Sequence, residues 1–399
     1  MPSNGIAGKV AVVGMGCSAF GERWDAGTDD LILEAYQECL ESVPALGRGD
    51  VDAYWLGTLS SGLGGLTLSR AIATDDKPVT RVENFCATGS EAFRNACYAV
   101  AAGAYDIVMA VGVEKLKDSG YSGLLRQDPP GDGTAPEISM TAPAAFSLID
   151  PAYCARYGVH PDEMRAAMTH VAWKNHDNGT RNPKAQFRSP VARETIDKAP
   201  KVAGRLGIFD CSGVSDGAAC ALIVSAERAH EFTDTPMYVH GLSLISGSAR
   251  GSMDSDFDYT TFPEVVRAAK DAYAQAGIDR PAEQLSMAEV HDCFTPTEIV
   301  LMEDLGFCDA GHAWKDVLDG AFDAGGRLPV NPDGGLKSFG HPVGASGLRM
   351  LYEAWLQFRG AAGERQLADP RTALTHNLGG RPGGCVSFVS IVSREMRRP

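Results

Sequence analysis

A cysteine between an expected strand and an expected helix is the first candidate for chemistry. Cys86 stands in the segment Asn-Phe-Cys-Ala-Thr-Gly-Ser, after the expected strand at residues 79–85 and before the alanine-rich stretch at 92–102. The N-terminus of a helix carries partial positive charge and free N–H groups, which stabilise a thiolate and make it a better nucleophile. Free cysteines are also among the most buried residues, so a structural role for Cys86 stays open at this point.

Two histidine motifs lie in the C-terminal part of the chain. His341 stands in Gly-His-Pro-Val-Gly-Ala-Ser-Gly, ahead of an expected helix at residues 345–359. Its imidazole can act as a base near neutral pH, although a phosphate-binding turn or a structural turn would use the same residues. His291 and Cys293 belong to His-Asp-Cys-Phe at the end of an expected strand at 287–292. Alternate strand residues share a face, so both side chains would enter one cavity or join the core.

A glycine-rich segment precedes the last expected strand. Residues 376–380 read His-Asn-Leu-Gly-Gly, and Gly383 and Gly384 follow shortly after. Consecutive glycines expose backbone N–H groups that suit an oxyanion hole, and a simple turn between two strands would use the same residues.

Three other kinds of site are not expected. No third ligand stands near His291 and Cys293 in the sequence, which argues against a metal site. The Gly-x-Ser-x-Gly match at residues 213–217 runs into an expected strand, whereas a serine nucleophile elbow needs a helix there. Gly14-x-Gly16 lacks the third glycine of a dinucleotide-binding fingerprint.

The composition is that of a folded, acidic protein. The 399 residues are 44% hydrophobic, and 36 Lys and Arg against 51 Asp and Glu give a net charge of −15. A negative surface repels phosphate backbones, so nucleic acid is not an expected partner.

Apolar runs such as residues 107–113 are far shorter than the roughly 20 residues that span a bilayer, and the N-terminus does not resemble a signal peptide. The 10 cysteines include no Cys-x-x-Cys pair, so we expect reduced thiols and a cytoplasmic protein.

Strands and helices alternate along most of the chain. The expected strands, most of them short apolar runs, lie at residues 9–16, 51–57, 79–85, 105–113, 217–225, 237–244, 287–292, 372–377 and 385–392. The expected helices lie at residues 29–42, 66–74, 92–102, 160–175, 262–275, 296–305 and 345–359. This alternation predicts an α/β fold with covered sheets.

The two halves of the chain resemble each other in the order of their elements. The strand, helix and strand of residues 9–57 return at 237–292, and each half then presents a reactive residue before an alanine- and glycine-rich helix, Cys86 or His341. A duplicated α/β unit that faces itself would place both helix N-termini in one cleft. We divide the chain into an N-terminal half with Cys86 (1–116 and 206–235), an inserted loop region that is irregular apart from one helix (117–205), and a C-terminal half with His291, Cys293 and His341 (236–399).

The four motifs, in this order, resemble those of the thiolase superfamily. The order is a nucleophilic Cys, then HDCF, then GHPxGxSG, then a glycine-rich C-terminal turn, and the resemblance extends over essentially the whole chain. It is strongest to the sterol-carrier-protein-type and archaeal-type thiolases, which carry HDCF where other thiolases have NEAF. The resemblance implies duplicated βαβαβαββ halves in five α/β/α/β/α layers. It also implies reversible Claisen condensation or thiolytic cleavage of 3-ketoacyl-CoA in lipid metabolism such as β-oxidation, with coenzyme A and acyl-CoA as substrates and no permanent cofactor.

The resemblance also assigns a role to each motif residue. Cys86 matches the nucleophile that becomes acylated, and His341 matches the base that removes its proton. His341 further resembles a donor to the thioester oxygen of the second substrate, together with a water that His291 would hold. The backbone N–H groups of Cys86 and Gly379 match the hole for the acyl-enzyme oxyanion.

Many thiolases carry their second acid/base cysteine on the C-terminal turn, where this chain has Asn377. An amide cannot shuttle a proton, so Cys293 of HDCF is the expected substitute. A thiol beside a histidine can be tuned to take the α-proton of a thioester. Cys385 begins an expected core strand, and we assign it a structural role.

Alternatives remain within the same fold. One is a condensing enzyme, a C-acyltransferase or a retro-aldolase that acts with a partner subunit, although retention of Cys86 counts against the aldolase. Another is a non-catalytic acyl-CoA-binding subunit. Some relatives work with a small zinc-ribbon and OB-fold protein that helps to bind acyl-CoA, and this chain has few basic runs to hold the CoA phosphates. A homodimer, or a dimer of dimers, is implied by the resemblance alone.

Overall fold

Nine strands form a mixed sheet whose strand order repeats. The computed structural model describes residues 5–119, 141–252, 254 and 256–396, and the sheet order is β3-β2-β4-β7-β1-β8-β11-β10-β9. The strands of the first half are β1 (Val10–Cys17), β2 (Ala53–Gly57), β3 (Val79–Val82), β4 (Ile107–Glu114) and β7 (Gly217–Ser225). The strands of the second half are β8 (Met237–Ser246), β9 (Met287–Glu289), β10 (Thr372–Arg381) and β11 (Gly384–Ser393).

The pairing pattern of the first half returns in the second. β1 pairs antiparallel with β7, β7 antiparallel with β4, and β4 parallel with β2. In the same way β8 pairs antiparallel with β11, β11 antiparallel with β10, and β10 parallel with β9. Only two residue pairs, Ala11 with Tyr238 and Val12 with Met237, join β1 to β8. The structure therefore confirms the duplication that the sequence predicts.

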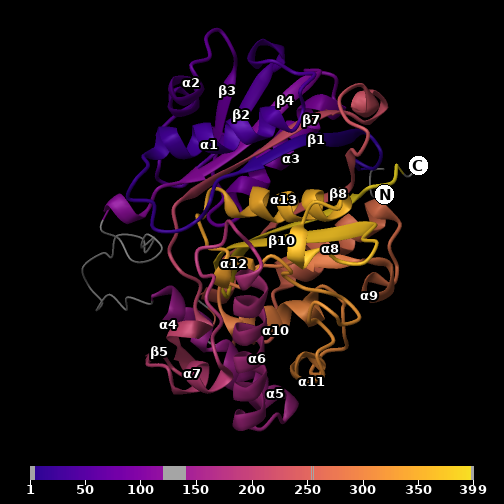
Figure 1. The fold of residues 1–399 in the computed structure, drawn as a ribbon. Helices are drawn as coiled ribbons and strands as arrows, with labels where there is room; N and C mark the ends of the chain where they lie inside the picture. The colour runs from indigo at the N-terminus through magenta and orange to yellow at the C-terminus, as the bar shows by residue number, and fades with distance from the viewer. Residues whose placement is uncertain (1–4, 120–140, 253, 255, 397–399) are drawn as a thin grey trace.

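Helices form three layers around the two halves of the sheet (Figure 1). α1 (Thr28–Glu41) and α2 (Leu66–Ile72) pack on the outer face of the first half, and α8 (Pro263–Ala276) packs on the outer face of the second. α3 (Thr88–Ala101) and α13 (Ser346–Phe358) share one core with the inner faces of both halves. The order of layers is α/β/α/β/α, as expected.

The region at residues 117–205 differs from the expectation of a mostly irregular loop. Its described part is largely helical, because α4 (Ala142–Ser147), α5 (Ile149–Tyr157) and α7 (Arg193–Lys198) accompany the longer α6 (Pro161–Thr180). Six to nine residues are too few for a helical period to stand out in the sequence. Residues 120–140 of this region lie outside the described part of the chain.

The remaining elements are short and connect the larger ones. They are α9 (Pro281–Gln284), α10 (Thr295–Asp304), α11 (Ala313–Leu318), α12 (Gly335–Ser338), β5 (Lys201–Ala203) and β6 (Leu206–Gly207). Within the described ranges, no helix has both the length and the hydropathy needed to cross a bilayer.

Candidate active site

Cys86 lies in the tight link between β3 and α3. The expected strand ends at Val82, and Phe85 adopts a left-handed conformation with φ of 52°. The Thr88 hydroxyl fastens this turn, because it accepts from the Asn84 N–H at 2.9 Å and donates to the Phe85 carbonyl at 2.5 Å. A non-glycine residue at positive φ costs about 1–3 kcal/mol and persists only where its surroundings hold it. The turn presents a nearly buried Cys86 thiol at the start of α3.

Two glycines let the N-terminal ends of α3 and α13 approach each other. A Cβ on Gly89 would lie 2.7 Å from the Gly344 carbonyl oxygen. A Cβ on Gly347 would lie 2.1 Å from the Ser90 hydroxyl. Real Cβ atoms do not approach other atoms so closely, so only glycine allows this packing. The two helix starts therefore meet in one site, as the duplication predicts.

His341 is held in one tautomer by Ser346. The Ser346 hydroxyl donates to the Pro342 carbonyl at 2.9 Å, so it accepts from His341 Nδ1 at 2.7 Å. The ring proton is then on Nδ1, and Nε2 carries the lone pair. Nε2 is buried and has no hydrogen-bond partner among the described residues. The His341 backbone N–H donates to Ser215 at 2.9 Å, which fixes the turn itself.

His291 is held in the opposite tautomer by Asn377. The Ser90 hydroxyl donates to Asn377 Oδ1 at 2.8 Å, which turns the Asn377 amide nitrogen towards His291 Nδ1 at 3.3 Å. His291 Nδ1 thus accepts, and its proton is on Nε2. The site therefore combines an imidazole acceptor, His341, with an imidazole donor, His291.

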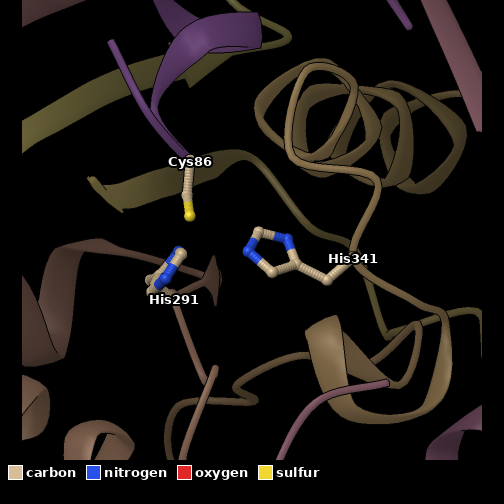
Figure 2. Close-up of side chains that lie close together, drawn as sticks. All are labelled: Cys86, His291 and His341. Atoms are coloured by element: carbon tan, nitrogen blue, oxygen red, sulfur yellow. The ribbon is translucent and has the colours of Figure 1, made fainter. Parts of the chain in front are cut away.

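Figure 2 shows the Cys86 thiol and the two rings facing one another. The ligand atoms of Cys86, His291 and His341 all lie within 4.8 Å of one another. The two rings are almost perpendicular, with an angle of 81° and centroids 5.3 Å apart. A thiol and two imidazoles are ligands that zinc accepts, so the fold brings together a set of possible ligands that the spacing in the sequence does not reveal. The third ligand, Cys86, is more than 200 positions away in the sequence.

Burial keeps all three groups neutral in the free protein. Burial raises the pKa of Cys86 to about 12, and the carboxylates of Glu114 and Glu83 add to this effect. Burial, together with the Arg349 cation, lowers the pKa of His341 to about 3, and burial also holds the pKa of His291 well below its usual value. Burial therefore outweighs the helix terminus, which we expected to stabilise a thiolate. The free protein therefore has a neutral Cys86 thiol beside the unprotonated imidazole of His341.

Cys293 lies near the same site, but strand alternation does not place it there as we expected. β9 ends at Glu289, so the alternation of a strand does not carry on to Cys293, which instead lies just before α10. Burial raises the pKa of the Cys293 thiol, and the nearby Cys86 and Asp292 raise it further, whereas Lys337 lowers it. Cys293 lies close enough to interact with Cys86 but is not part of the group within 4.8 Å.

Asp292 turns away from the site. It accepts from the backbone N–H of Leu336 at 2.6 Å and from the amide of Asn175 at 2.8 Å. Since α6 supplies Asn175, the helical region between the two halves supports the segment that carries His291 and Cys293.

Gly379 lies in strand β10 and not in a turn. It pairs with Val386 of β11, and a Cβ at this position would lie 2.5 Å from the Asn84 carbonyl oxygen and 3.0 Å from the Phe85 side chain. The Gly379 backbone therefore lies against the turn that carries Cys86. Cys385 is buried in β11, where its thiol donates to the Arg381 carbonyl at 2.8 Å, which agrees with a structural role.

Several supporting residues were not assigned from the sequence. Ser90 and Ser346 stand inside the quoted motifs, so a hydroxyl close to each reactive residue was the feature from which their supporting role could have been predicted. Arg349 is fully buried on α13, where its guanidinium donates to Glu289 and Asp333 at 2.5 Å each. Its only signal in the sequence is a charged residue inside an apolar helix.

Two family comparisons cover most of the chain. The family described as thiolase, N-terminal domain, matches residues 10–227, and the family described as thiolase C-terminal domain-like matches residues 246–392. The acetyl-CoA acetyltransferase of Methanothermobacter thermautotrophicus is 37% identical over 399 residues, which cover 96% of this chain and 99% of that protein. Sterol carrier protein 2 of Gallus gallus is 30% identical over 93% of this chain and 70% of that protein.

Solved structures with lower identity share the fold. The structure titled Ltp2-ChsH2(DUF35) aldolase has a TM-score of 0.83 at 24% identity, over 98% of this chain and 99% of that one. The acetyl-CoA acetyltransferase from Syntrophomonas wolfei has a TM-score of 0.69 at 19% identity, over 98% of this chain and 100% of that one. The family matches and the full-length relative above 30% identity show that this chain belongs to the thiolase family.

Proposed function

We propose that this thiolase-type acyltransferase catalyses reversible Claisen condensation, or thiolytic cleavage, of 3-ketoacyl-CoA through an acyl-Cys86 intermediate. The observation that carries the proposal is the buried Cys86 thiol beside Nε2 of His341, which has no hydrogen-bond partner in the described part of the chain. A nucleophile with an adjacent base, which is itself oriented by a third group, is the arrangement that covalent acyl transfer requires. Ser346 is the orienting group.

The first half-reaction transfers the acyl group to Cys86. The thiol proton moves to His341 Nε2 as the Cys86 sulfur bonds to the thioester carbon. The bond from that carbon to the CoA sulfur then breaks, and the departing sulfur takes a proton from Cys293. The backbone N–H groups of Cys86 and Gly379 stabilise the oxyanion between these steps, since Gly379 lies against the Cys86 turn.

The second half-reaction forms the carbon–carbon bond. The Cys293 thiolate takes the α-proton of a second acyl-CoA, and the carbanion attacks the acyl carbon on Cys86. The thioester oxygen of the second substrate receives hydrogen bonds from His341 Nε2–H and from a water held by His291 Nε2–H. The Cys86 sulfur departs and recovers its proton from His341, which restores the starting state. Thiolysis is the same sequence in reverse.

We further propose the setting in which this activity operates. The substrates are coenzyme A and acyl-CoA thioesters with no permanent cofactor, and the pathway is lipid metabolism such as β-oxidation in the cytoplasm. The halves 1–116 with 206–235 and 236–399 act as one unit in a homodimer or a dimer of dimers. The acetyl-CoA acetyltransferase relative supports the substrate class.

A second candidate is a retro-aldolase that acts with a small acyl-CoA-binding partner. In its favour, the fold likeness to the Ltp2-ChsH2(DUF35) aldolase has the higher TM-score of the two solved structures described above. Against it, an aldolase has no need of an acyl-enzyme, whereas Cys86 and its base are both in place here.

Intact-protein mass spectrometry after brief exposure to a panel of acyl-CoAs tests the proposal. We expect an acyl adduct on the wild type and none on Cys86→Ala. Cys293→Ala keeps the nucleophile and its base but lacks the acid for the departing CoA sulfur, so it should load an acyl group more slowly and fail to condense it. No adduct from any donor, with or without a co-purified partner, would refute the acyl-enzyme mechanism and favour the second candidate.

A further inference from the structure

The Cys86 thiol and the imidazoles of His291 and His341 are groups that can ligate a metal ion as well as take part in acyl transfer. Their ligand atoms lie within 4.8 Å of one another, and all three residues are buried. His341 Nε2 points into this space without a hydrogen-bond partner among the described residues. An unpartnered lone pair at a buried position is costly unless something fills it.

We propose that Cys86, His291 and His341 bind one Zn²⁺ ion in the free enzyme, and that the bound ion blocks acyl transfer reversibly. Metal binding itself depends only on the geometry of the three side chains. The block on acyl transfer rests on the function proposed above.

The distances suit a tetrahedral zinc site after small side-chain adjustments. Zinc binds thiolate sulfur at about 2.3 Å and imidazole nitrogen at about 2.0–2.1 Å, which places neighbouring ligand atoms roughly 3.3–3.6 Å apart. The observed separations, all within 4.8 Å, close to these values if each side chain moves by less than about 1 Å. Three protein ligands leave a fourth position open for water, as in zinc sites that are not purely structural.

Both histidines can offer Nε2 to the metal. His341 needs no change, because Ser346 already holds its proton on Nδ1. His291 must move its proton from Nε2 to Nδ1, and a 180° turn of the Asn377 amide supplies the acceptor. After this turn the Asn377 amide nitrogen faces Ser90. The Ser90 hydroxyl then accepts a hydrogen bond from that nitrogen, whereas in the structure it donates to the Asn377 oxygen. Such outer partners that fix the ring tautomer are a regular part of zinc sites.

The donor types select the metal. Thiolate and imidazole favour Zn²⁺ over Mg²⁺ and Ca²⁺, which prefer oxygen ligands, and the group contains no carboxylate. When Zn²⁺ binds, the Cys86 thiol loses its proton to solvent and the sulfur lone pair forms the metal bond. Acyl transfer needs the same sulfur and the same Nε2 of His341. The metal-bound and acylated forms therefore exclude each other.

The site offers matched control variants. Cys293 is a thiol in the same site, and His376 is a buried imidazole near His291, yet neither belongs to the group within 4.8 Å. Cys293→Ala and His376→Gln should therefore keep the metal site, whereas Cys86→Ala and His341→Gln should lose it. Unfolding midpoints of all variants show whether each one is folded.

Binding is measured on full-length protein that has been stripped with a chelator. We expect one Zn²⁺ per chain by calorimetry, and Co²⁺ should give the thiolate-to-metal charge-transfer band and the intense visible bands of a tetrahedral site. Loss of a ligand in Cys86→Ala should weaken Zn²⁺ binding by roughly 100-fold or more, since loss of a mere outer partner already costs 10–100-fold. Binding by Cys86→Ala that equals the wild type, a Co²⁺ spectrum without a thiolate band, or an equal loss in Cys293→Ala would overturn the site.

The block on catalysis is tested separately by mass spectrometry. Zn²⁺ should prevent acyl loading of Cys86, and a chelator should restore it. Normal loading at saturating Zn²⁺ would overturn the mutual exclusion. If Zn²⁺ binds as expected but no acyl donor loads the metal-free protein, the proposed function fails while the metal site stands.

Discussion

Removal of the Ser346 hydroxyl tests the tautomer assignment on which the base depends. In the structure this hydroxyl accepts from His341 Nδ1 and donates to the Pro342 carbonyl, so the lone pair of the ring is on Nε2, next to Cys86. In Ser346→Ala the Nδ1–H loses its acceptor at a fully buried position. The ring can then adopt the other neutral tautomer, whose Nε2–H cannot take the thiol proton.

The expected loss follows from the cost of the unmade hydrogen bond. A buried donor without a partner costs about 1–3 kcal/mol. If the whole cost falls on the reactive tautomer, acyl loading slows by roughly 5- to 150-fold, since each 1.4 kcal/mol is a factor of ten in rate. Ser346→Thr keeps a hydroxyl at the same atom position and should recover most of the loss.

Quenched acyl loading, followed by intact mass at several acyl-CoA concentrations, gives the limiting rate and the half-saturating concentration. We expect Ser346→Ala to lower the limiting rate and leave half-saturation unchanged. The matched control is Ser338→Ala, because Ser338 is equally buried and donates to the Phe187 carbonyl at 2.6 Å, away from the His341 ring. Loading by Ser346→Ala within twofold of wild type, or an equal slowing in Ser338→Ala, would refute the reasoning.

Three further predictions concern packing, buried charge and pH. Gly379→Ala puts a Cβ 2.5 Å from the Asn84 carbonyl oxygen. It should therefore lower the free energy of unfolding by about 1–3 kcal/mol and slow acyl loading of Cys86. Unchanged urea denaturation and unchanged acyl loading would contradict this. Arg349→Met leaves two carboxylates buried without their cation and should cost about 3–5 kcal/mol in urea denaturation. Its control, Arg371→Met at an exposed ion pair, should cost no more than about 1 kcal/mol, and equal losses would show that burial of the pair does not matter. Burial raises the pKa of Asp304 from 3.8 to about 7, so its protonated form stabilises the fold at pH 4, and that stabilisation is lost as pH rises through 7. Between pH 4 and 8 the unfolding free energy of the wild type should therefore fall by up to about 4 kcal/mol more than that of Asp304→Asn. Parallel pH profiles for the variant and the wild type would exclude the effect.

Local patterns predicted most of the regular structure. The apolar runs became β1, β2, β4, β7, β8, β10 and β11 with small shifts at their ends, and the repeated order of elements predicted the repeated strand pairing. The short helices α4, α5 and α7 were missed, because one or two turns carry too little periodicity. β9 ended early at Glu289 since the following residues make tertiary contacts in place of a sheet ladder.

The sequence by itself determined which residues could react and where each one sits locally. Cys86 before a helix, His341 in a glycine-dense turn and His291 in HDCF could all be identified from residue type and neighbours. Only the tertiary structure decided that their reactive atoms meet within 4.8 Å, which nitrogen of each ring carries the proton, and that burial leaves thiol and imidazole neutral. The physical reason is that proximity and burial depend on segments hundreds of positions apart, which are brought together by close packing at Gly89 and Gly347. The tautomers depend on hydrogen-bond geometry, which even a near neighbour such as Ser346 shows only in the folded chain.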